Sequence, residues 1–98
     1  MKRTNNPFLS YYPSIDLHGE DKVGAIVKFN DFINDSIKLK NYNIIIVHGK
    51  GTGVLRKSIH EYLRKDKRIV SFKTDNLNDG ITIVYLKEEL WKGKMDLL

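Results

Sequence analysis

A glycine-rich segment near the middle of the chain has the residue types best suited to hold a phosphate group. It reads His-Gly-Lys-Gly-Thr-Gly over residues 48–53, and Val54-Leu55-Arg56 follows directly. Glycines adopt positive φ freely, so successive backbone N–H groups can converge on one anion, and a helix that begins here adds its free N–H groups and its dipole. The spacing predicts an anion-binding loop made of His48, Gly49, Lys50, Gly51, Thr52, Gly53 and Arg56.

The glycine spacing excludes the two common nucleotide-cofactor loops. A Walker A loop needs four residues between its first glycine and a Gly-Lys-Ser/Thr, and G-x-G-x-x-G needs a longer gap before its third glycine than residues 49–53 provide. We therefore expect no nucleotide cofactor, and the loop favours the phosphodiester backbone of a nucleic acid. A tight strand-to-helix turn without a ligand is the alternative interpretation.

Positive charge is concentrated beside this loop. The chain has a net charge of +5, and residues 50–68 alone hold seven Lys or Arg against two Asp or Glu, which leaves ten of each sign elsewhere. A local basic excess is typical of polyanion binding, although a solvated helix face has the same composition. The predicted nucleic-acid surface therefore extends from the loop to Lys57, His60 and Arg64.

A second constellation, Asp16-Leu17-His18-Gly19, ends a short extended segment. Strand alternation places Asp16 and His18 on one face and Leu17 on the other. If this segment lies beside the strand that leads into the glycine loop, Asp16, His18 and His48 converge. An Asp–His pair can orient an imidazole as a general base or hold a divalent ion such as Mg²⁺ or Mn²⁺. A hydrogen-bonding histidine without a catalytic role is the alternative.

The periodicity of apolar residues places both motifs on an α/β framework of order β-α-β-α-β-β. Strands are expected at 14–17, 44–47, 69–74 and 81–86, and helices at 21–39 and 54–65. The apolar stripe of the first helix is expected to contain Val23, Ile26, Val27, Ile33 and Ile37, with Phe29 and Phe32 beside it. In the third strand, Val70 and Phe72 are expected to share the buried face.

The connections predict how these strands are arranged. Right-handed crossovers make the first two strands parallel, and their carboxyl ends meet at the edge where open α/β sheets bind ligands. The last two strands are close in sequence and should pair antiparallel. The predicted fold is a two-layer α/β sandwich in which two helices pack on a four-stranded mixed sheet.

Two short segments flank this expected domain at 14–87. Residues 1–13 form an arm whose aromatic residues Phe8, Tyr11 and Tyr12 are expected to pack on the domain, and the tail at 88–98 contains Leu90 and Trp91 in a possible short helix. No apolar run approaches the roughly 20 residues of a membrane span, no signal-peptide core is present, and cysteine is absent. We expect a soluble, cytoplasmic protein without membrane contact.

Two of these motifs together resemble signatures of the Smr (small MutS-related) family. Residues 16–19 resemble L-D-L-H-G, with Ile15 where the family usually has Leu, and residues 48–56 resemble H-G-x-G-T-G-x-L-R. Residues 80–84 are similar to the closing strand of the family. The resemblance covers about 14–87 and implies a two-layer α/β fold like the C-terminal domain of translation initiation factor three.

The resemblance also implies nucleic-acid binding and, in several members, nicking of DNA or cleavage of RNA. Asp16 and His18 are then the catalytic candidates, and residues 48–56 hold the substrate. Our leading hypothesis is an endonuclease that prefers nucleic-acid structure over sequence. A non-catalytic nucleic-acid or ribosome-binding module is the main alternative, and a small-molecule phosphate enzyme is a third. The sequence leaves open whether the substrate is DNA or RNA, whether a metal ion is used and which oligomeric state forms. It also leaves open whether the domain stands alone or is a C-terminal fragment.

Overall fold

Four strands form one mixed sheet, and the strand order places the two predicted motifs side by side. The computed structural model describes residues 12–88. Across the sheet lie β1 (Ser14–Asp16), β2 (Asn43–Val47), β4 (Ile81–Leu86) and β3 (Ile69–Thr74). β1 runs parallel to β2, and β4 is antiparallel to both of its neighbours. The predicted mixed sheet and element order are confirmed, with strand ends within one residue of expectation.

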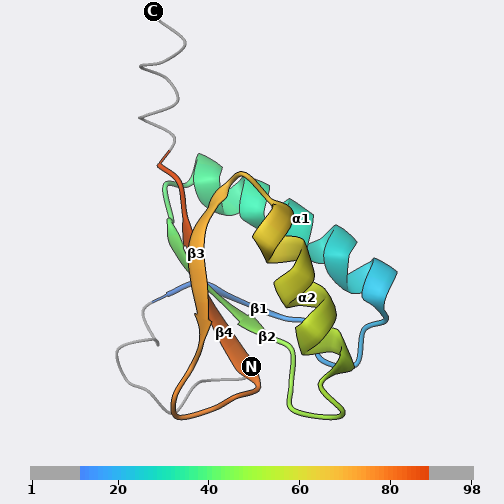
Figure 1. Ribbon diagram of the computed structural model, residues 1–98. Helices are drawn as coiled ribbons and strands as arrows, with labels where there is room; N and C mark the ends of the chain where they lie inside the picture. Colours follow the sequence, from blue (N-terminus) through green and yellow to red (C-terminus); the bar gives the residue numbers. More distant parts are fainter. Residues whose placement is uncertain (1–11, 89–98) are drawn as a thin grey trace, which may run out of the picture.

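Both helices pack on the same face of this sheet, which gives two layers (Figure 1). α1 (Lys22–Lys38) begins after Asp21, whose side-chain Oδ1 accepts the Gly24 N–H at 2.7 Å. α2 (Val54–Lys65) begins directly after the glycine loop. The core between the layers contains Leu17, Ala25, Phe29, Ile33, Ile44, Ile46, Ile59, Leu63, Val84 and Leu86.

The central strand β2 is buried on both faces along its β-branched residues 44–47. Ile44 and Ile46 face the helices, whereas Ile45 and Val47 belong to a smaller cluster with Ile81 and Ile83 on the opposite face. Tyr12 and Tyr85 pack against that second cluster. Tyr12 therefore packs on the domain as expected, while the predictions for Phe8, Tyr11, Leu90 and Trp91 lie outside the described residues.

The buried stripe of α1 matches the expected one only in part. Ile33 and Phe29 are buried and Ile37 packs against the core, as expected, together with the small residues Ala25 and Ser36. Val23 and Val27 are instead 72% and 57% exposed. At about 100° per residue, Val23 and Val27 lie nearly opposite the Ala25–Phe29–Ile33 stripe, so one helix cannot bury both sets. The stripe that contains Phe29 and Ile33 faces the sheet, and small Ala25 and Ser36 allow close approach.

The expected alternation in β3 is also wrong. Ile69 pairs with Leu86 while Ser71 pairs with the adjacent Tyr85, so one extra residue is inserted in β3. Such a bulge shifts the alternation of side chains by one position. Ile69 and Phe72 consequently pack against the core, whereas Val70 is 62% exposed.

Candidate functional site

The parallel pairing of β1 and β2 brings the Asp16–His18 motif against the glycine loop. The Leu17 N–H donates to the Val47 carbonyl at 2.7 Å, one residue before the loop. Gly49 has a φ of 79°, and a Cβ added there would lie 3.2 Å from the Cβ of His18. The contact is tight enough that a larger residue at position 49 would displace His18. The predicted proximity of Asp16 and His18 to the loop is therefore correct.

Asp16 and His18 form an exposed hydrogen-bonded pair. The Oδ1 atom of Asp16 lies 2.6 Å from His18 Nδ1, and it also accepts the backbone N–H of His18 at 3.1 Å. The side chains are 38% and 65% exposed. When His18 donates its Nδ1 proton to Asp16, its Nε2 atom carries the free lone pair. This arrangement suits a general base that a substrate can reach.

The start of α2 offers backbone donors to an anion. Its N-cap, Gly53, has a φ of 84° and contributes no side-chain hydrogen bond, and Thr52 Oγ1 reaches the Val54 N–H only at 3.4 Å. The first N–H groups of a helix lack partners within the helix and lie at the positive end of its dipole. An anion in this position would satisfy them.

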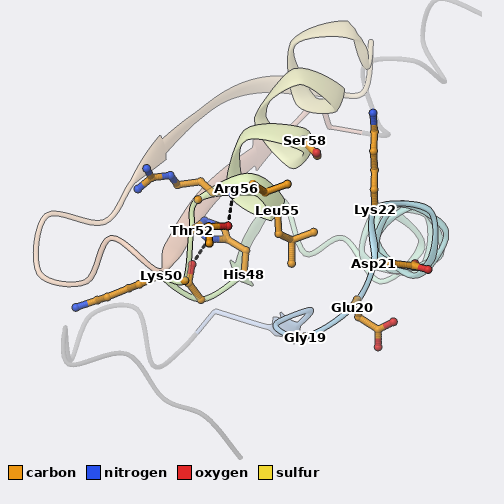
Figure 2. A pocket seen from close by; sticks show the side chains of 14 residues that line it. Gly19, Glu20, Asp21, Lys22, His48, Lys50, Thr52, Leu55, Arg56 and Ser58 are labelled. Atoms are coloured by element: carbon orange, nitrogen blue, oxygen red, sulfur yellow. Dashed lines mark hydrogen bonds between the residues drawn. The ribbon is translucent and has the colours of Figure 1, made fainter.

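Two grooves lie against the loop and share Gly49 and Lys50. The larger, of 310 Å³, runs between the start of α1 and the start of α2, and the smaller, of 250 Å³, is lined by His18, Asn78 and Gly80 among others. Figure 2 shows Lys50 and Arg56 directed to one side of the larger groove, away from Glu20 and Asp21. An anion is therefore favoured on the α2 side.

His48 does not turn its ring toward Asp16 and His18. It is 4% exposed, and its Nδ1 lies 2.9 Å from the Gly49 carbonyl oxygen while its Nε2 lies 2.8 Å from Thr82 Oγ1. Burial lowers the pKa of His48, and the positive charge of Arg56 lowers it further, against the opposing effects of the Gly49 carbonyl and Asp79. The expected convergence thus holds for the His48 backbone but not for its imidazole. Its role in holding substrate stays a prediction.

His60 reaches the same threonine from the other side. Its Nε2 lies 2.7 Å from Thr82 Oγ1, and its ring centroid is 4.9 Å from that of Phe72. Burial lowers the pKa of His60, as do His48, Arg64 and Arg56. His60 is part of the predicted nucleic-acid surface, but its side chain is half-buried over the sheet. Its contact with nucleic acid stays a prediction.

Thr82 is the residue that the sequence did not single out. It is fully buried near the start of β4, opposite Ile46 of β2, and its hydroxyl joins the two histidines. The only hint in the sequence is a hydroxyl residue between the apolar Ile81 and Ile83, and such an isolated threonine is common in strands.

Lys50, Lys57 and Arg64 lie exposed on the loop and α2, and Arg56 is half-buried. Arg64 places its guanidinium carbon 5.9 Å from the Phe72 ring centroid. Lys50 is 69% exposed and lies 3.8 Å from Asp79 Oδ1, a surface pair of little strength. These side chains are available to a polyanion.

Arg68, in contrast, is withdrawn from the basic surface. It donates to Asp66, to Asn30 at 2.8 Å and to Asn34 at 2.7 Å, and so connects the end of α2 to α1. The hydrogen bonds that Arg68 donates hold the pKa of Asp66 below its ordinary value, and the same bonds raise the pKa of Arg68. Burial raises the pKa of Tyr62, whose hydroxyl oxygen accepts a hydrogen bond from Arg68.

Within residues 12–88, no three or more His, Asp or Glu side chains lie close enough together to hold a metal ion among themselves. Neither helix in this part of the chain has the length and apolar character needed to cross a membrane.

Comparison with known proteins now identifies the class. Residues 15–87 match the family model of the Smr domain, and the chain belongs to this family. It is 42% identical over 76 residues to a protein named endonuclease MutS2 from Finegoldia magna, which covers 74% of this chain and 10% of that protein. The MutS2 protein of Ligilactobacillus salivarius is 42% identical over 79 residues. This chain thus spans about a tenth of the length of these curated relatives.

Solved structures agree with the fold. The Smr domain of Thermus thermophilus MutS2 superposes with a TM-score of 0.74 at 33% identity, over 76% of this chain and 98% of that domain. YdaL, a stand-alone small MutS-related protein from Escherichia coli, gives a TM-score of 0.72 over 79% of this chain and 68% of that chain. Its 20% identity supports the shared fold alone.

Proposed function

We propose that this chain binds the sugar–phosphate backbone of nucleic acid and cleaves it as a nicking endonuclease. One observation carries the proposal: the exposed Asp16–His18 pair, with 2.6 Å between Oδ1 and Nδ1, lies directly beside the glycine loop. The relatives named endonuclease MutS2 support it, since that name describes cleavage within a nucleic-acid chain. This chain spans about a tenth of the length of these relatives, so its activity is a proposal.

Binding begins with a phosphate at the start of α2. Backbone N–H groups of the loop and of the first helical turn donate to its oxygens, and Lys50 and Arg56 add charge. Each charge-assisted hydrogen bond of this kind contributes about 1.5–3 kcal/mol. Lys57 and Arg64 are exposed for neighbouring phosphates along the strand. Such contacts read the backbone, so the preference is for nucleic-acid structure rather than base sequence.

The chemistry falls to His18. Its Nε2 removes a proton from a water molecule, or from a ribose 2′-hydroxyl in RNA, and that oxygen forms a bond to phosphorus. The P–O bond to the leaving sugar oxygen breaks, and this oxygen takes up a proton from solvent. Asp16 holds the ring and stabilises the imidazolium that forms. Loop N–H groups hold the phosphate charge throughout.

The test combines binding and cleavage. Purified chain is incubated with supercoiled plasmid and with structured RNA, with and without Mg²⁺ or Mn²⁺, because a divalent ion stays a prediction. The wild type should nick at least one substrate, and Asp16→Asn should abolish nicking while salt-dependent binding persists. Asp31→Asn, on the exposed surface of α1, is the matched control. Equal nicking by Asp16→Asn and the wild type would contradict the catalytic assignment.

A non-catalytic binding module is the second candidate, and one contact favours it. Asp16 Oδ1 accepts the His18 backbone N–H, so this carboxylate also shapes the turn between β1 and α1. In that case the chain docks on nucleic acid or on a ribosome without cutting. Binding that weakens steeply with salt, together with no cleavage under any metal condition, would establish this candidate. Affinity that does not change with salt would reject both candidates.

A further inference from the structure

A buried chain of hydrogen bonds runs from α2 through β4 to the glycine loop. The Gly49 carbonyl can only accept, so the His48 Nδ1 atom, 2.9 Å away, must carry a proton. A neutral imidazole has one donor and one acceptor, which makes His48 Nε2 an acceptor for the Thr82 hydroxyl. The oxygen of Thr82 then accepts from His60 Nε2–H. Every donor and acceptor in this series of hydrogen bonds is thereby assigned. His48 is the Nδ1–H tautomer and His60 is the Nε2–H tautomer.

The surroundings of the two rings support this assignment. Burial lowers the pKa of both His48 and His60, and the nearby cations Arg56 and Arg64 lower it further for His60. Both imidazoles are therefore neutral near pH 7, as the chain of donors and acceptors requires. Within residues 12–88, no buried side-chain nitrogen or oxygen lacks a hydrogen-bond partner.

The hydrogen bond from His48 Nδ1 to the Gly49 carbonyl sets the orientation of the peptide between Gly49 and Lys50. The described backbone has no cis peptide bond, and in a trans peptide the C=O and N–H point in opposite directions. Because the Gly49 carbonyl is directed at the buried His48 ring, the N–H of Lys50 is directed away from it. The preceding backbone is held as well, since the N–H groups of His48 and Gly49 both donate to the Gly80 carbonyl at 3.0 Å.

We propose that Thr82 and His60 are positioning residues, which act through His48 to hold the Lys50 N–H in the direction that receives a phosphate. This inference rests on the proposed function and adds to it two residues outside the glycine motif. It differs from simple satisfaction of buried polar groups, because it predicts that removing the Thr82 hydroxyl changes the loop and its affinity for phosphate.

The experiment compares Thr82→Val, which removes the hydroxyl at constant shape, with Thr82→Ser, which retains it. Ile83→Val, on the other face of the same strand, is the control for loss of packing. Histidine ¹⁵N signals should show the wild-type His48 as the Nδ1–H tautomer and His60 as the Nε2–H tautomer. In Thr82→Val this pattern should be lost, and the Lys50 amide should shift and exchange faster with solvent.

Affinity for a short duplex is the second measurement. Thr82→Val should bind about ten-fold more weakly, the size of effect expected when one buried hydrogen bond is lost. Thr82→Ser should recover most of the affinity, and Ile83→Val should retain it. If Thr82→Val does not fold, His60→Leu is used instead. It removes the hydrogen bond from His60 to Thr82 and should shift the same amide signals.

The outcomes separate this inference from the proposed function. An unchanged Lys50 amide and unchanged affinity in a folded Thr82→Val variant would overturn the positioning role, even if the wild type cleaves nucleic acid. Identical tautomers at His48 and His60 would overturn it as well. A wild type that binds neither DNA nor RNA would overturn the proposed function. The amide signals would still decide whether the hydrogen bonds through Thr82 hold the loop.

Discussion

The Asp16–His18 pair and the His48–Thr82 pair use the same interaction in opposite surroundings. Each joins an imidazole nitrogen to a side-chain oxygen, at 2.6 Å and 2.8 Å respectively. His18 is 65% exposed in its side chain, whereas His48 is 4% exposed and Thr82 is fully buried. A substrate can reach the first imidazole, and only the protein reaches both nitrogens of the second. Under the proposed function this difference amounts to a division of labour, in which the exposed pair performs chemistry and the buried pair shapes the backbone that holds the phosphate.

The largest expected effect comes from the exposed pair. Replacement of His18 with alanine removes the general base and should lower the cleavage rate by about 10²–10⁴-fold. Because the side chain is exposed, the free energy of unfolding should change by no more than about 0.5 kcal/mol. Gel assays of plasmid nicking and urea unfolding measure the two quantities. A large loss of stability would show that this pair, like the buried one, is structural.

A pair of glycine substitutions tests the contact between the two regions. Gly49 and Gly19 have similar φ values of 79° and 82°, so alanine at either position should cost about 1–2 kcal/mol in backbone strain. Only at Gly49 does the new Cβ crowd His18, at 3.2 Å, whereas nothing lies within 4 Å at Gly19. Gly49→Ala should therefore cleave about ten-fold more slowly than Gly19→Ala in single-turnover assays, since small displacements of catalytic groups reduce rates strongly. Equal rates would mean that His18 adjusts without loss.

Smaller effects are expected from the cations around the loop. Arg56→Ala should weaken binding several-fold at all sequences, and the slope of log affinity against log salt should fall by about 1. Titrations of a fluorescent duplex at several salt concentrations measure the slope. Lys38→Ala, in the last turn of α1, is the control and should leave the slope unchanged. The same slope for Arg56→Ala and the wild type would remove Arg56 from the binding surface.

The smallest effect is a dependence of folding stability on pH that comes from His48 and His60. Their pKa values lie below 6.5 in the folded chain and at about 6.5 when unfolded, so the unfolded chain binds more protons between these values. Stability is therefore complete above pH 6.5 and declines as the pH falls below it. Urea unfolding at pH 7.5, 6.5 and 5.5 should show the decline, and His60→Leu should reduce it.

Asp66 does not contribute to this decline. The lowered pKa of Asp66 places its contribution at a different pH, since stability from this carboxylate is lost only as the pH falls below 3.8. Stability that stays constant from pH 7.5 to 5.5, in both the wild type and His60→Leu, would contradict the burial of neutral imidazoles.

The features predicted correctly from the sequence are those governed by local periodicity. The two-residue repeat of a strand places Leu17 in the core and leaves Asp16 and His18 outside. The periodicity of apolar residues likewise places both helices within one residue of their observed ends. Each of these signals lies within a few neighbouring residues, so no tertiary information is needed to interpret it.

The features that were missed depend on contacts between distant segments. Thr82 matters because β4 pairs with β2 and because α2 places His60 over it, 22 residues away in sequence. Val23 and Val27 fit a helical repeat as well as Phe29 does, and only packing against the sheet selects one stripe. The bulge in β3 likewise follows from its pairing with β4.

The most direct test of the division of labour is the single-turnover cleavage rate as a function of protein concentration, measured for His18→Ala and Thr82→Val. The account predicts that His18→Ala lowers the rate at saturation and leaves the half-saturating concentration unchanged. Thr82→Val should raise the half-saturating concentration about ten-fold and leave the rate at saturation within a few-fold of the wild type. If His18→Ala changes only the half-saturating concentration, or Thr82→Val only the saturated rate, the assignment of chemistry to the exposed pair and loop positioning to the buried one is contradicted.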